Sequence, residues 1–108
     1  MTDRYSEYVP LLKIVADETR LKIIARLSKG PCCACDLLEE LNVTQPTLSY
    51  HMKMLTGCEL VIGTKKGIWM RYTLNPEKSK ACSDFMREVL CNCYGQEEAL
   101  ESLCTHED

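Results

Sequence analysis

Apolar residues recur at helical spacing in the N-terminal part of the chain and predict two consecutive helices. The first apolar stripe comprises Tyr5, Tyr8, Leu12 and Val15. The second comprises Leu21, Ile24 and Leu27. Pro10 is expected to begin or to kink the first helix, because proline lacks the N–H that an interior helical position donates. Asp17 is a good N-cap for the second helix, and Gly30 is placed to end it.

Two further helical patterns lie between residues 31 and 55 and are joined by a short turn. Their apolar positions are Leu37, Leu38 and Leu41 in the first and Leu48, Met52 and Leu55 in the second. Between them, Asn42 can adopt a left-handed turn conformation and Thr44 is placed as an N-cap. The free face of the second helix carries Gln45, Thr47, Ser49, Tyr50, His51 and Lys53. Two structures fit this stretch: a helix-turn-helix that reads DNA, and a hairpin of two helices with a solvated polar face.

The apolar period changes from helical to alternating between residues 60 and 74. The alternating positions are Ile68, Met70, Tyr72 and Leu74. This pattern predicts a β-hairpin with its turn at Lys65-Lys66-Gly67. Lysines at the tip of a hairpin that follows a recognition helix would form a wing able to reach DNA phosphates. Alternatively, the lysines only keep a solvated hairpin from pairing with other chains.

The most regular helical pattern of the chain begins after Asn75 and Pro76. Its apolar stripe comprises Cys82, Phe85, Met86, Val89, Leu90 and Cys93. The chain has 108 residues, which is the size of one domain. We therefore expect a single, mainly α domain over residues 1–108, with a helix-turn-helix at about 32–56, a wing at about 60–74 and a last helix at about 76–94.

Charge and cysteine content narrow the function. The net charge is −3, yet residues 44–74 are enriched in Lys and Arg, while residues 95–108 contain Glu and Asp but no Lys or Arg. No N-terminal apolar run resembles a signal peptide, and no stretch approaches the ~20 apolar residues that span a bilayer. We therefore expect a cytoplasmic protein with no membrane partner. In a reducing compartment, the eight cysteines indicate metal or redox chemistry rather than a disulfide scaffold.

Four motifs occur in an order that resembles the ArsR/SmtB family of metal-responsive transcriptional repressors. They are ADETRLKIIARLSKG, CACDLLEEL, TQPTLSYHMKML and GIWMRYTL, and the resemblance covers about residues 9–76. It implies a winged helix-turn-helix fold and a homodimer built on the first and last helices. It also implies that metal binding releases operator DNA. A dimer would present two recognition helices to a palindromic operator, about one DNA turn or ~34 Å apart.

The resemblance also assigns DNA-facing residues. On the recognition helix they are Gln45, Thr47, Ser49, Tyr50, His51 and Lys53, and in the wing they are Lys65, Lys66 and Arg71. Enzymatic activity is not expected, and neither is a protein substrate. The chain has no Cys-x-x-Cys motif in a βαβ setting, no nucleophile elbow and no phosphate-binding loop.

The segment from Cys33 to Leu37 resembles the Cys-x-Cys-Asp-Leu metal-binding box of the arsenic and antimony sensors in this family. A helix N-terminus lowers the pKa of a thiol and so favours the thiolate that binds soft metals. Residues at i and i+2 do not face each other on a regular helix, whereas Cys32 and Cys35 do. Gathering Cys32, Cys33 and Cys35 around one ion would therefore distort the first helical turn, which is a route from metal to DNA release.

The third metal ligand stays open. Several arsenic sensors have a cysteine where this chain has Leu38. Cys32 is the first substitute, and Cys91, Cys93 or Cys104 could instead supply the ligand or form a second site. Three thiolates with no nearby His or carboxylate suit trivalent arsenic or antimony, while zinc normally takes four ligands with nitrogen or oxygen among them. Cadmium or lead is a further alternative.

Two other functions fit the same chain. A thiol-redox or persulfide sensor of the same fold would release DNA when a cysteine pair is oxidised. A metal-buffering protein would bind ions without touching DNA. The polar recognition face and the lysine wing count against this second interpretation.

Overall fold

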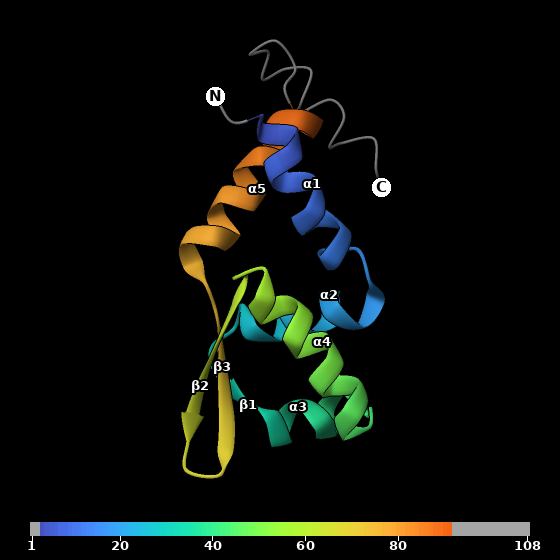
Figure 1. The fold of residues 1–108 in the computed structure, drawn as a ribbon, viewed down its shortest axis with the longest axis vertical. Coiled ribbons are helices and arrows are strands. Elements are labelled where there is room, and N and C mark those ends of the chain that lie inside the picture. The colour runs from blue at the N-terminus through green and yellow to red at the C-terminus, as the bar shows by residue number, and fades with distance from the viewer. Residues whose placement is uncertain (1–2, 92–108) are drawn as a thin grey trace, which may run out of the picture.

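A computed structural model describes residues 3–91 of the chain, and these residues form five α-helices and three short β-strands. The helices are α1 (Arg4–Val15), α2 (Glu18–Leu27), α3 (Ala34–Leu41), α4 (Gln45–Gly57) and α5 (Pro76–Cys91). The strands are β1 (Cys32–Cys33), β2 (Val61–Lys66) and β3 (Trp69–Leu74). Helices α1 and α5 lie side by side at one end, and α3, α4 and the hairpin form the other (Figure 1). This arrangement confirms the mainly α, winged helix-turn-helix prediction.

The core lies where α2, α3, α4 and the start of β2 meet. Its fully buried side chains are Ile23, Leu37, Leu55 and Val61, one from each of these elements. Leu48 and Met52 add to it from α4, as the apolar spacing of that helix predicts. The recognition helix is therefore held by its apolar face, and its opposite face is left free.

The ends of the helices follow the predicted capping residues. The Asp17 side chain accepts a hydrogen bond from the backbone N–H of Arg20 at 3.0 Å, and this bond lowers the pKa of the Asp17 carboxyl. Thr44 Oγ1 accepts from the N–H of Thr47 at 3.3 Å and begins α4. Asn42 ends α3 in the left-handed conformation, with φ of 54°. The turn between α3 and α4 is thus set by its own residues.

The N-terminal helices depart from the expectations in two places, since α1 does not begin at Pro10 and the buried face of α2 does not include Leu21. Helix α1 begins at Arg4, because Asp3 caps it by accepting from the N–H of Tyr5 at 3.2 Å, and Pro10 lies inside the helix. In α2 the buried positions are Arg20, Ile23 and Leu27, whereas Leu21 is 50% exposed. The buried face is shifted because Arg20, a charged residue, occupies a core-facing position.

The hairpin is tighter than predicted. Its turn lies at Gly67 and Ile68, and Lys66 pairs with Trp69 across it. Gly67 has φ of 62°, which suits the first central position of a type II′ turn. The two lysines therefore belong to β2 itself, and Ile68, 87% exposed, lies at the tip. The short strand β1 pairs with β3 on its other side, so the sheet order is β1-β3-β2.

Helix α5 packs on α1 through aromatic contacts. The ring of Phe85 stacks on Tyr8 with centroids 4.6 Å apart and meets Tyr5 edge-on at 5.8 Å. Arg4 donates to Glu88 at 2.7 Å beside them. Phe85 is buried by these contacts, but Val89 and Leu90 on the same helix are 50% and 70% exposed. Among the described residues, no helix is long and apolar enough to cross a membrane.

Candidate nucleic-acid interface and thiol site

The free face of α4 carries the predicted polar side chains. Five of the six predicted residues are exposed, namely Gln45, Thr47, Ser49, Tyr50 and Lys53. They are presented because Leu48, Met52 and Leu55 hold the opposite face in the core. The exposed side chains offer hydroxyl, amide and ammonium groups, which are the groups that contact phosphates and base edges in the major groove.

His51 is the exception, and the structure corrects its assignment to this face. Its side chain is 9% exposed, and its Nδ1 accepts a hydrogen bond from Nε of Arg20 at 3.0 Å. On α4 it lies between the exposed Tyr50 and the buried Met52, and its ring points toward Arg20 of α2. His51 is therefore a buried hydrogen-bonding residue and not a side chain that faces outward.

The wing extends the same polar surface. Lys65, Lys66 and Arg71 are all exposed on the hairpin. Lys65 pairs with Met70 and Lys66 with Trp69, while Arg71 pairs with Thr64. These cations lie at or near the end of the hairpin, where they can reach phosphates beside a groove that holds α4.

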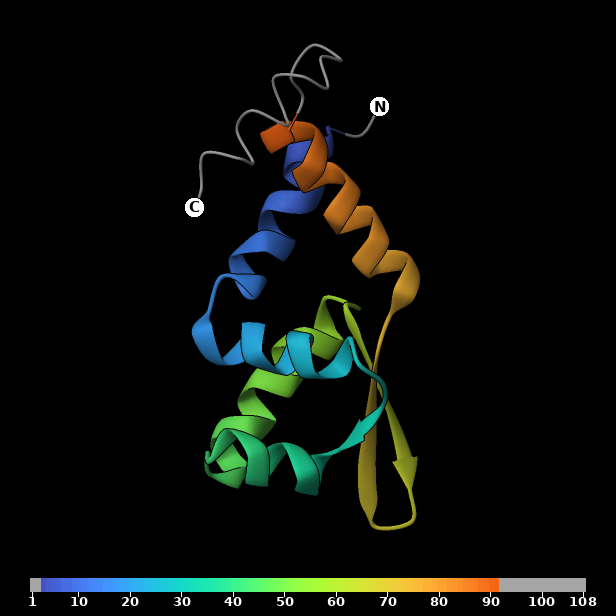
Figure 2. The ribbon, with the colours of Figure 1, turned by 180° about the vertical axis from the view of Figure 1, so that it is seen from behind.

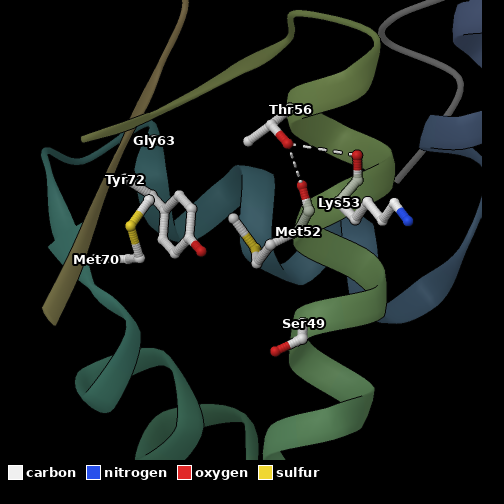
Figure 3. A pocket seen from close by; sticks show the side chains of 7 residues that line it. All are labelled: Ser49, Met52, Lys53, Thr56, Gly63, Met70 and Tyr72. Atoms are coloured by element: carbon white, nitrogen blue, oxygen red, sulfur yellow. Dashed lines mark hydrogen bonds between the residues drawn. The ribbon is translucent and has the colours of Figure 1, made fainter. Parts of the chain in front are cut away.

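A cavity of about 350 Å³ separates α4 from the hairpin (Figure 3). Its walls are Ser49, Met52, Lys53 and Thr56 from α4 and Gly63, Met70 and Tyr72 from the hairpin. A Cβ at Gly63 would lie 3.0 Å from the side chains of both Met70 and Tyr72, so a larger residue there would require these side chains to shift by a few tenths of an ångström. Partial burial raises the pKa of the Tyr72 hydroxyl. A groove lined by both polar and apolar side chains therefore lies between α4 and the hairpin.

The thiols of Cys33 and Cys35 lie together at the start of α3. Their Sγ atoms are 2.9 Å apart, and Cys33 Sγ also donates to Asp36 Oδ2 at 3.3 Å. The ligand atoms of these three residues all lie within 4.8 Å of one another. Cys33 is the N-cap residue, with extended φ and ψ of −86° and 160°, so it is not part of the helix. For this reason the thiols of Cys33 and Cys35 meet although the two residues are only two positions apart.

The other cysteines are placed differently. Cys32 is 4% exposed within the core, so the structure does not bring it to the pair as a third ligand. Cys58 and Cys82 are partly buried against the core. Cys91 is exposed at the end of α5. Cys93 and Cys104 lie outside the described residues.

The pKa values of Cys35 and Cys32 differ from the expectation that a helix N-terminus lowers the pKa of a thiol. The pKa of Cys35 is raised, first by its hydrogen bond with Cys33 and then by partial burial and nearby negative charge, including Asp36. The backbone N–H of Asp36 acts in the opposite sense but is the weaker influence. Burial raises the pKa of Cys32. Two thiols and one carboxylate nevertheless fit a thiophilic ion, because such an ion displaces the thiol protons when it binds.

Replacement of Asp36 by asparagine is expected to speed the alkylation of Cys35 at neutral pH. Removing the negative charge lowers the pKa of this thiol, so about two- to fourfold more of it is thiolate. The rate of modification by iodoacetamide, followed residue by residue by mass spectrometry, measures the effect. Glu39→Gln removes a charge from the same helix about one turn further on and serves as the control. An unchanged rate in Asp36→Asn would show that this carboxylate does not influence the pair.

Strand β1 joins the thiol site to the wing. Cys32 pairs with Tyr72 of β3, and Cys33 pairs with Arg71. The sequence did not predict this strand, because two residues are too short to show a period. It also did not predict the contact of Arg20 with His51, which joins residues far apart in the chain. The pairing of β1 with β3 therefore places Cys33, one of the two adjacent thiols, directly opposite Arg71 of the wing.

Comparisons with known proteins agree with this geometry. A family profile described as bacterial regulatory protein, arsR family, matches residues 17–62. The arsenical resistance operon repressor of Staphylococcus xylosus is 49% identical over 73 residues, which are 68% of this chain and 70% of the relative. The repressor of the same description from Bacillus subtilis (strain 168) is 40% identical over 86 residues, 79% of each chain. The structure of HlyU from Vibrio cholerae N16961 is 30% identical with a TM-score of 0.70, covering 84% of this chain and 99% of that one.

Proposed function

We propose that trivalent arsenic or antimony is the inducer of this chain, which belongs to the ArsR family of bacterial regulatory proteins. Like the relatives described above, the chain is a transcriptional repressor and not an enzyme. In this proposal residues 1–108 act as a single winged helix-turn-helix domain that binds a palindromic operator as a homodimer. The metalloid binds Cys33 and Cys35 and releases the DNA. As a repressor on bacterial DNA, the protein acts in the cytoplasm.

The observation that carries the proposal is the thiol pair at the start of α3. Two sulfur atoms 2.9 Å apart can bind one ion without prior rearrangement of the backbone. A site with two soft thiolates and a third ligand favours trivalent arsenic or antimony over zinc, which normally takes four ligands. Two relatives are described as arsenical resistance operon repressors, which supports the same choice. Cadmium or lead would use the same thiols.

The third ligand in this proposal is Asp36 or a thiol from the C-terminal part of the chain. Asp36 already lies beside the pair. Cys32 is disfavoured because moving it to the pair would remove a buried side chain from the core. Cys91, Cys93 and Cys104 remain the candidates for a ligand from either subunit or for a second site.

Release follows from the position of Cys33 between two elements. It is the last residue of β1 and the N-cap of α3, so a displacement of Cys33 acts on both. Through β1 it reaches Arg71 of the wing, and through α3 it reaches the recognition helix, which packs against α3. Either route changes the relative position of wing and α4, the two parts of the proposed DNA surface.

Binding to the DNA upstream of its own gene should weaken steeply with salt. Each phosphate contact contributes about 0.9 to the slope of log affinity against log salt concentration, so Lys65→Ala/Lys66→Ala should flatten the slope and weaken binding. Fluorescence anisotropy of labelled DNA with reduced protein measures both quantities. Lys29→Ala is the matched control, since Lys29 lies beside Thr73 and Pro76 at the opposite end of β3. Equal slopes in the wing variant and the wild type would remove the wing from the interface.

A second function is favoured by one distance. The Sγ atoms of Cys33 and Cys35 are close enough for a disulfide to form when an oxidant accepts two electrons and the two thiol protons are lost. In this alternative, oxidation and not metalloid binding releases DNA. Titration of the reduced protein with arsenite separates the two, because only the metalloid sensor releases the operator under reducing conditions.

A further inference from the structure

Arg20 is buried between three helices although it carries a permanent charge. Its side chain is 8% exposed. Nε donates to His51 Nδ1 of α4 at 3.0 Å, and a terminal guanidinium nitrogen donates to the backbone oxygen of Ile14 at 3.1 Å. Ile14 lies in the last turn of α1, whose carbonyl oxygens have no partner within their own helix. One α2 side chain therefore joins the end of α1 to the middle of the recognition helix.

The same guanidinium also supports an exposed residue of the recognition helix. Its Cζ atom lies 5.5 Å from the centre of the Tyr50 ring, which is within cation–π range. The Tyr50 ring meets the His51 ring edge-on at 5.4 Å. Tyr50 itself is 56% exposed on the polar face of α4. From the buried side of α4, Arg20 thus orients Tyr50, a side chain of the proposed DNA surface.

Stability alone does not account for a charge at this position. Among residues 3–91, no salt bridge includes the Arg20 guanidinium. Asp17 accepts a hydrogen bond from the Arg20 backbone N–H, and its carboxylate lies 4.0 Å from Nδ1 of His51. Burying a charge without a carboxylate partner is costly, and apolar side chains of similar volume are often at least as stable. A buried arginine with directed hydrogen bonds specifies one geometry instead.

We propose that Arg20 is a positioning residue for operator binding, which fixes the orientation of α4 relative to α1 through His51, Ile14 and Tyr50. The inference rests on the proposed DNA-binding function. Helix α2 lies between α1 and the helix-turn-helix (Figure 2). Helix α1 exposes Tyr5 and Val9 and is one of the two helices on which the expected homodimer is built. This link therefore sets how the two recognition helices of a dimer are presented to successive turns of DNA.

The test compares operator binding with binding to a scrambled duplex of equal length. The variants are Arg20→Met and the double variant Arg20→Met/His51→Leu, which fills the site with apolar side chains and does not leave the His51 ring buried without its partner. Arg26→Met is the matched control, because Arg26 is an α2 arginine bonded at the surface to Glu40 at 3.0 Å. Thermal midpoint and dimer mass are measured for each protein.

We expect the double variant to keep its dimer mass and thermal midpoint but to lose about tenfold or more in operator affinity, with scrambled-duplex binding unchanged. If the double variant regains both the thermal midpoint and the operator affinity that Arg20→Met loses, the inference is overturned and Arg20 is a purely structural residue. Tyr50→Leu, an exposed substitution that does not endanger folding, should reproduce part of the loss, and added to Arg20→Met it should weaken binding by less than the sum of the two. Additive losses would contradict the link. Failure of the folded wild type to prefer the operator would instead refute the proposed function and the role of Arg20 with it.

Discussion

Replacement of Cys33 or Cys35 by serine is expected to abolish the release of operator DNA by arsenite while leaving operator binding intact. A serine hydroxyl does not replace the soft thiolate, and loss of one of two adjacent thiols removes the pair. The concentration of arsenite needed for release should rise by about hundredfold or more, at least as much as loss of an outer-shell partner costs in metal sites. Operator affinity should not change, because neither side chain belongs to the exposed face of α4 or to the hairpin.

Two other cysteines provide controls for this experiment. Cys58→Ser changes a partly buried thiol at the end of α4 and should leave the arsenite response as it is. Cys32→Ser should lower the thermal midpoint, since it places a hydroxyl in the core, but the folded protein should still respond. Anisotropy of the DNA during arsenite titration measures all four variants. A full response in Cys33→Ser or Cys35→Ser would move the sensor to Cys91, Cys93 and Cys104.

The second large effect is expected from Leu90→Glu on α5. Leu90 is 70% exposed and lies next to Val89 on a helix whose Phe85 already packs on α1, so the surface beyond these contacts suits a second copy of the chain. A glutamate there would be buried in the dimer without a partner, which should convert the protein to a monomer. Operator affinity should then fall by about hundredfold, because one recognition helix replaces two.

Leu21→Glu is the matched control for the dimer. Leu21 is 50% exposed on α2, so the substitution has the same chemistry on a different helix. Sedimentation of the free proteins gives their mass, and anisotropy gives the operator affinity. If Leu90→Glu remains a dimer while Leu21→Glu dissociates, the proposed interface on α1 and α5 is in the wrong place.

The sequence predicted those features that depend on neighbours along the chain. The caps at Asp17 and Thr44, the left-handed Asn42 and the apolar face of α4 all depend on residues within a few positions, and all are confirmed. The hairpin was predicted from its alternation, but its turn was placed too early. The two lysines were assigned to the turn, whereas the φ of Gly67 places the turn at Gly67 and Ile68.

The features that the sequence did not predict depend on contacts between distant segments. His51 was assigned to the polar face because a histidine is polar, yet the Arg20 side chain 31 positions earlier pairs with it in the core. That same arginine shifted the buried face of α2 from Leu21 to Ile23. Likewise, Cys33 was treated as helical, although its pairing with Arg71 keeps it extended and lets its thiol meet that of Cys35.

The position of Trp69 makes the protein its own optical probe. It is the single tryptophan of the chain, half exposed near the tip of the wing and opposite Lys66. Its emission therefore reports the surroundings of the wing, including the pocket that Trp69 lines together with residues of α3 and α4. Because Arg71, two residues along the same strand, pairs with Cys33, unlabelled protein can reveal by fluorescence both the docking of the wing on DNA and any strand movement that begins at the thiols.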